Sequence, residues 1–105
     1  MGFAEASKVE NGIDSGTLTG KRYPIACKAW FTVGGDPTPL SFQFEGDDGE
    51  IQTVRRQELK ILHKENKNYC GIPSKEFLCT VMLRGVSIPM KLVFNCESCS
   101  WAMYV

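Results

Sequence analysis

The sequence predicts one small all-β domain, an antiparallel barrel or strongly bent meander of about six or seven short strands. Apolar and polar residues alternate through most of residues 26–105, which is the period of a half-buried strand. Gly, Pro, Asn and Asp separate these segments at short intervals, and no segment reads as a long helix. Among such folds an SH3-like barrel is our first choice, and a two-sheet β-roll is the second.

The chain of 105 residues is expected to form a single domain. Residues 1–22 combine four glycines with isolated apolar positions, so we expect a flexible N-terminal tail followed by one β-barrel domain over residues 23–105. No apolar run approaches the ~20 residues that cross a bilayer, and the start shows no secretory signal. These features predict a cytoplasmic protein that does not enter a membrane.

The first half of the domain contains three expected strands. Residues 26–33 place Cys27, Ala29, Phe31 and Val33 on one face, and a glycine-rich turn follows. Residues 40–45 alternate most regularly. The Asp-Asp-Gly turn that comes next tolerates the positive φ angles of a hairpin, which predicts a return strand over residues 50–54.

Residues 55–66 are ambiguous, because good helix formers compete with the alternation of Leu59, Ile61 and His63. We predict a strand over residues 59–63 after a short turn, with a short helix as the alternative. Residues 65–73 are polar and rich in Asn, Gly and Pro, so they are expected to form a loop.

The last part of the chain predicts the most apolar strands. Residues 77–83 and 86–94 form a long hairpin about Arg84-Gly85, with strongly apolar inner faces. Pro89 cannot donate a backbone hydrogen bond and therefore indicates an edge or a bulge. Residues 101–105 form the closing strand.

Four local features occur together in a recognisable order. They are the run Pro39-Leu40-Ser41-Phe42, the turn Asp48-Gly49, the hairpin of residues 77–94 with Cys79 in its first strand, and Trp101 near the end. In this order, over about residues 26–105, the chain resembles a group of small uncharacterised bacterial proteins. It differs from them in the lysine-rich segment before Tyr69 and in its extra cysteines. The group has no assigned activity, so the resemblance implies no functional residue.

Cys96 and Cys99, separated by two residues, are the one short motif with recognisable chemistry. Two such thiolates can face one metal ion, but zinc sites usually combine two pairs, and here the remaining ligands would be Cys70 and His63, or Cys27. The five cysteines form an odd set in a chain without an export signal, which argues against a disulfide framework. A zinc-binding or cysteine-dependent protein is therefore an alternative hypothesis, and no cofactor is expected.

The sequence does not predict an enzyme. His63 is the only histidine, and no local signature makes a cysteine its nucleophilic partner. There is no phosphate-binding glycine loop and no serine nucleophile elbow.

Charge is balanced overall, with twelve basic and twelve acidic residues, which argues against a non-specific nucleic-acid binder. The distribution is uneven, because residues 34–50 carry only acidic charges and residues 55–67 are mainly basic. The basic residues are Arg55, Arg56, Lys60, Lys64 and Lys67. They either keep edge strands from pairing with neighbours or orient a charged partner, and single-stranded nucleic-acid binding through residues 55–67 is a further alternative.

Large apolar side chains also fall on the faces opposite the expected core. They are Trp30, Leu78, Met82, Val93 and Tyr104. If they gather into a patch, a protein partner or a homodimer is expected. If the tail or a second layer of the fold covers them, neither is expected. The main prediction is therefore a non-catalytic binding or assembly module.

Overall fold

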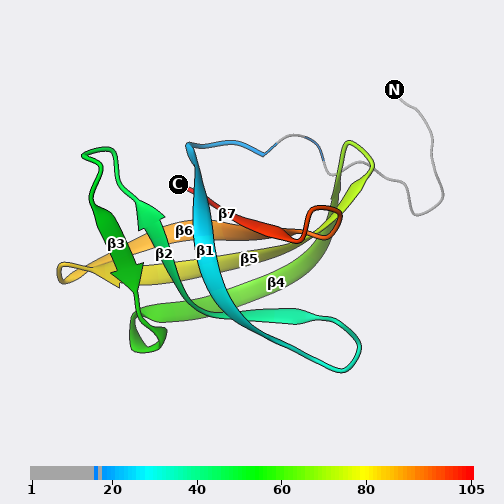
Figure 1. The fold of residues 1–105 in the computed structure, drawn as a ribbon, viewed down its shortest axis with the longest axis horizontal. Coiled ribbons are helices and arrows are strands. Elements are labelled where there is room, and N and C mark those ends of the chain that lie inside the picture. The colour runs from blue at the N-terminus through cyan, green and yellow to red at the C-terminus, as the bar shows by residue number, and fades with distance from the viewer. Residues whose placement is uncertain (1–15, 17) are drawn as a thin grey trace.

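The computed structural model describes residue 16 and residues 18–105, and within these residues the predicted all-β fold is confirmed. Seven antiparallel strands form one sheet that curls into a half-barrel (Figure 1). The strands are β1 (Arg22–Phe31), β2 (Pro37–Glu45), β3 (Ile51–Val54), β4 (Leu59–Tyr69), β5 (Ile72–Leu83), β6 (Val86–Asn95) and β7 (Ser100–Tyr104). All belong to the same sheet, so the two-sheet β-roll alternative is wrong.

The strand order is β3-β2-β1-β7-β6-β5-β4. The first three strands form one meander and the next three form another. The last strand, β7, lies between the two meanders, with Trp101 opposite Ile25 of β1 on one side and Phe94 of β6 on the other. The sheet edges are therefore β3 and β4.

The hydrophobic core lies on the inner face of the curl. The regular alternation of the strands buries every second side chain there, as the period of a pleated strand requires. The apolar faces expected for the β5–β6 hairpin and for β7 are confirmed in the core, except at their ends, where Val86 and Val105 are exposed. Its most completely buried large side chains include Phe42, Phe77, Leu92 and Met103.

Two expectations at the ends of strands are wrong. The first strand ends at Phe31, and Val33 is fully exposed beyond it, so Val33 does not belong to the core face. Residues 65–73 are not a loop, because β4 continues to Tyr69 and β5 begins at Ile72. The polar residues of β4 adopt a strand because they pair with β5 at the edge of the sheet, where one side faces solvent.

Two hairpins depend on residues with positive φ. Cys70-Gly71 joins β4 to β5 with φ values of 55° and 82°, and Arg84-Gly85 joins β5 to β6 with 51° and 77°. Successive left-handed residues are what a two-residue hairpin needs to match the twist of its strands. Pro89 is opposite Thr80 of β5 but lies beyond the residues of β6 that pair with β7, so its position is locally an edge, as predicted.

A single 3-10 turn, η1 (Arg56–Glu58), connects β3 to β4. The strand predicted after it is confirmed, and the helix alternative is reduced to this turn. Over residue 16 and residues 18–105, the structure contains no helix with the length and hydropathy needed to span a membrane. Most of the predicted tail, residues 1–15 and 17, lies outside the described residues.

Candidate functional site

The four predicted metal ligands come from two turns and one strand. Cys96 and Cys99 lie in the β6–β7 turn, Cys70 lies in the β4–β5 turn and His63 lies on β4. Among the residues that the structure describes, no three His, Cys, Asp or Glu side chains are grouped to hold a metal ion. The structure thus does not assemble the predicted ligand set.

Local roles account for these residues. Cys70 is the first residue of a hairpin turn with positive φ. Cys99 donates its thiol to the carbonyl of Cys96 at 3.9 Å. The exposed imidazole of His63 lies with Nε2 3.8 Å from Oε1 of Glu65. Each of these contacts belongs to a turn or to the surface of a strand.

Two further thiols are poor nucleophiles in this fold. Burial raises the pKa of Cys27 to about 12 and that of Cys79 to about 11. Cys79 also lies in the core and donates its thiol to the carbonyl of Met90 at 3.5 Å. Because the thiolate is the reactive form, neither thiol is activated at neutral pH.

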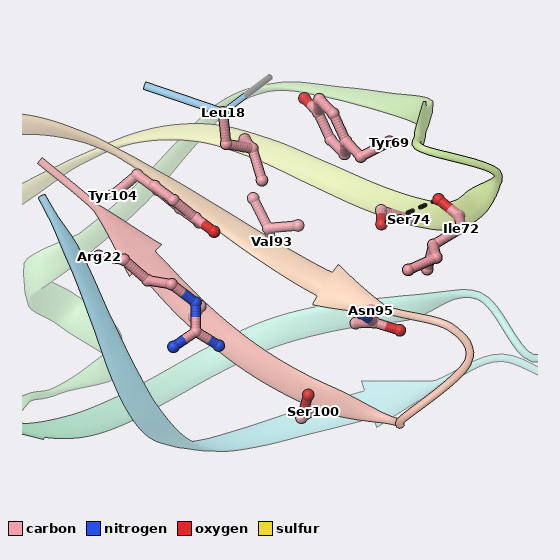
Figure 2. A pocket seen from close by; sticks show the side chains of 10 residues that line it. Leu18, Arg22, Tyr69, Ile72, Ser74, Val93, Asn95, Ser100 and Tyr104 are labelled. Atoms are coloured by element: carbon pink, nitrogen blue, oxygen red, sulfur yellow. Dashed lines mark hydrogen bonds between the residues drawn. The ribbon is translucent and has the colours of Figure 1, made fainter. Parts of the chain in front are cut away.

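The predicted apolar patch is not continuous. Trp30, Leu78 and Met82 are exposed, but Val93 is 5% exposed and Tyr104 is half-buried. Figure 2 shows Leu18 beside Val93, so the segment before β1 covers part of this face. The alternative that some of these residues are covered is therefore correct for Val93.

The cross-strand register separates the remaining members. Leu78 of β5 is opposite Lys91 of β6, which in turn is opposite Tyr104 of β7. A charged side chain thus lies between the two apolar ones. Trp30 is on β1 and pairs with Thr38 of β2, in the other meander.

A small pocket of about 120 Å³ lies on the outer face of the sheet (Figure 2). Arg22 and Tyr104 approach it from β1 and β7, and Tyr69 and Ile72 approach it from the β4–β5 turn. Its size would admit only a few water molecules or a small chemical group.

Glu76, a buried carboxylate, lies next to Ser74 and Val93 of this pocket in the sheet register. Oε2 of Glu76 accepts a hydrogen bond from the Tyr69 hydroxyl and lies 3.6 Å from Nζ of Lys91. Burial and the Glu76 contact raise the pKa of Tyr69 well above the usual tyrosine range. A buried charge needs such partners, so this cluster stabilises the fold.

An apolar hollow lies at one end of the half-barrel, and we call it the barrel mouth. Its volume is about 580 Å³, within the range of ligand-binding pockets. Its apolar lining comes from both meanders: Tyr23, Phe44, Leu83, Val86 and Ile88. The rings of Tyr23 and Phe44 pack edge to face at 5.8 Å, which fixes one wall.

Charged residues surround the barrel mouth on opposite sides. Asp47 and Asp48 lie on the β2–β3 turn, and Arg84 lies on the β5–β6 turn. Asp47 accepts a hydrogen bond from Lys21 at 2.6 Å and another from the Tyr23 hydroxyl at 3.2 Å. These bonds, chiefly that from Lys21, lower the pKa of Asp47.

The basic segment of residues 55–67 is divided by the fold. Lys60, Lys64 and Lys67 lie on the edge strand β4, where charge discourages pairing with another chain. Arg55 and Arg56 precede β4 and line a hollow together with Lys28 of β1.

Sequence reasoning did not identify the barrel mouth as a site. Phe44, Leu83 and Ile88 belong to the strands predicted over residues 40–45, 77–83 and 86–94, and they pack against the core. The available signal was their position at strand ends, where no further strand residue covers them. Their convergence depends on the curl of the whole sheet, which the alternation does not specify.

The fold and the barrel mouth define a small antiparallel half-barrel with one accessible apolar end. No protein-family model, curated protein or solved structure matches the chain. The resemblance to small uncharacterised bacterial proteins therefore stays a prediction.

Proposed function

We propose that this chain is a non-catalytic binding module whose barrel mouth receives an apolar side chain of a protein partner. The observation that carries the proposal is the accessible apolar lining of the mouth. Val86 is 58% exposed, and Phe44, Leu83 and Ile88 are only partly buried around it. Apolar surface exposed in one concave place is typical of binding sites, because covering it removes that surface from water.

The charges around the barrel mouth favour a peptide segment over a purely apolar ligand. Asp48 and Arg84 lie on turns that face each other across the hollow, and neither makes an ion pair with the described residues. A segment with an apolar side chain between a basic and an acidic residue would complement both. Such rim charges set the orientation and the association rate more than the affinity.

The alternative of a zinc-binding or cysteine-dependent protein has less support from the geometry. The turn that holds Cys96 and Cys99 supplies only one ligand pair, and Cys70 and His63 lie on two other elements and form no metal-binding group with it among the described residues. Elemental analysis of the purified protein tests it. Stoichiometric zinc that is lost on mutating both cysteines would replace the present proposal.

The proposal is tested by selecting peptides from a displayed random library against the wild-type protein and measuring their affinity by calorimetry. Val86→Asp places a charge in the mouth, and we expect it to weaken the selected peptides at least about tenfold. Ile51→Asp is the matched control, because Ile51 is 63% exposed but does not line the mouth.

The outcomes separate clearly. Equal binding to the wild type and to Val86→Asp, or equal losses in both variants, would contradict the proposal. Failure to select any peptide would contradict it too, unless sedimentation shows a dimer that Val86→Asp dissociates and Ile51→Asp does not. In that case the protein partner is a second copy of the chain.

A further inference from the structure

The outer face of the β1–β3 meander carries a hollow that the barrel mouth does not use. Two adjoining depressions of about 340 Å³ and 280 Å³ share Lys28, Ser41 and Thr53 in their lining. Lys28 is opposite Ser41 in the register of β1 and β2, so these side chains lie side by side. We call this surface the cationic groove, and its polar residues are Lys28, Ser41, Gln43, Thr53, Arg55, Arg56 and Gln57.

The charge of the cationic groove has one sign. Lys28, Arg55 and Arg56 line it, and no carboxylate from residue 16 or residues 18–105 does. None of the three cations makes an ion pair with the described residues. Glu58, which is next to this site in sequence, uses Oε1 to accept the backbone N–H of Arg55 at 2.9 Å. The groove is therefore complementary to an anion.

Four other lysines provide a contrast. Lys21, Lys67, Lys75 and Lys91 each lie within 4 Å of a carboxylate oxygen. The overall charge balance of the chain thus conceals a local excess of positive charge at the cationic groove. Neutral hydrogen-bonding groups lie among these charges, and the Gln43 amide donates to the Thr53 hydroxyl at 3.2 Å.

An exposed aromatic ring continues this surface. Trp30 is 68% exposed and follows Lys28 by two residues on β1, which is about 6.8 Å along a strand. Ala29, between them, packs against the core, so Lys28 and Trp30 share the outer face. A ligand that contacts both the exposed indole and the unpaired cations needs a flat apolar surface and a negative charge.

We propose that the cationic groove and Trp30 bind single-stranded nucleic acid, with phosphates on Lys28, Arg55 and Arg56 and a base stacked on Trp30. Binding of single strands combines a positively charged track for the backbone with aromatic rings for the bases. A phosphorylated protein would match the cations but would leave Trp30 unused. The groove is on the opposite side of the sheet from the inward-facing barrel mouth, so the two proposals are independent.

The test measures fluorescence anisotropy of a labelled 15-nucleotide oligodeoxythymidylate in about 0.1 M salt, where charges more than about 10 Å apart are largely screened. The double variant Lys28→Glu with Arg55→Glu is expected to weaken binding at least about thirtyfold, because two phosphate contacts become repulsive. The matched control is Lys64→Glu with Lys67→Glu, which changes the net charge equally on the β4 edge, farther along this strand from Arg55 and Arg56. The control is expected to bind within about threefold of the wild type.

The stacking contact is tested separately. Trp30→Leu is expected to weaken binding about tenfold, whereas Trp30→Phe keeps an aromatic face and most of the affinity. The oligonucleotide should also quench the tryptophan fluorescence of the protein. This quenching can be assigned to Trp30, because the other tryptophan, Trp101, is buried in the core. Three phosphate contacts predict that binding weakens about twentyfold between 50 and 200 mM salt.

Three results would overturn the proposal. The first is equal loss of binding in the groove variant and in the β4 control, which would indicate attraction by net charge alone. The second is full affinity in Trp30→Leu, and the third is no binding at 50 mM salt. A phosphopeptide that binds tighter than the oligonucleotide would instead identify a phosphorylated protein as the partner. Circular dichroism of each variant confirms that these exposed substitutions leave the fold intact.

Discussion

Removing the hydroxyl of Tyr69 should destabilise the fold through the buried carboxylate of Glu76. Glu76 is 4% exposed, so bulk water reaches its carboxylate poorly and does not fully replace a lost hydrogen-bond donor. Tyr69→Phe keeps the ring and deletes only the hydroxyl that donates to Glu76. Lys91, with Nζ 3.6 Å from the same oxygen, remains as a partial partner.

The size of the effect follows from these contacts. A hydrogen bond to a charged group contributes about 1.5–3 kcal/mol to the free energy of unfolding. Because Lys91 remains beside Glu76, the loss in Tyr69→Phe should be about 1.5–2 kcal/mol, at the lower end of this range. With a urea m-value of about 1 kcal/mol/M for a domain of this size, the unfolding midpoint should fall by about 1.5–2 M. Urea unfolding followed by circular dichroism at pH 7 measures it.

Tyr104→Phe is the matched control. The Tyr104 hydroxyl lines the same outer pocket, and the described residues give it no hydrogen-bond partner, so its removal should cost less than about 0.5 kcal/mol. Glu76→Gln removes the charge, and Tyr69→Phe should then cost less than in the wild type. The reasoning is refuted if the two tyrosine variants unfold at the same urea concentration, or if the cost of Tyr69→Phe is unchanged in Glu76→Gln.

Three further predictions concern the core, a turn and alkaline pH. Leu92→Ala removes a fully buried side chain and should cost about 2–5 kcal/mol of unfolding free energy, whereas Leu62→Ala, at a 57% exposed position, should cost under about 0.5 kcal/mol in the same urea assay. Gly20→Ala should cost at least about 2 kcal/mol, because φ is +96° and a Cβ would lie 2.8 Å from the carbonyl oxygen of the C-terminal residue. Gly85→Ala, also at positive φ but in open space, should cost only about 1 kcal/mol, and equal losses would contradict this steric argument. Burial raises the pKa of Cys79 from 9.0 to about 11, so the contribution of the neutral thiol to stability is present below pH 9 and is lost as the pH rises through 11. The urea midpoint of Cys79→Ala should therefore fall less than that of the wild type between pH 8 and pH 10.5. An equal fall in both proteins would contradict this pH dependence.

The sequence predicts those strands whose apolar residues alternate against one core. The β5–β6 hairpin is the best example, because its alternation and the Arg84-Gly85 turn specify both the strands and their connection. Strand β4 beyond His63 was not predicted, because its polar residues carry no apolar period. It exists because β5 supplies the hydrogen-bond partners, which is a non-local cause.

The candidate sites were less predictable for the same reason. Glu76 gave no signal as a buried carboxylate, because its partner Tyr69 fell in the expected loop. The cationic groove combines Lys28 with Arg55 and Arg56, which are almost thirty residues away in sequence. Charge counting identified the basic segment, but only the strand register shows which of its members meet.

The position of β7 has a consequence for how the chain is made. In the described part of the chain, hydrogen bonds of the sheet connect the β1–β3 meander to the β4–β6 meander only through this strand, which is the last of the seven in chain order. During synthesis both meanders leave the ribosome before β7 does, so each waits with an open edge and a partly uncovered apolar face. The sheet is therefore complete only once β7 has emerged, and the interval before that is the stage at which the nascent chain is most exposed to aggregation and to chaperones.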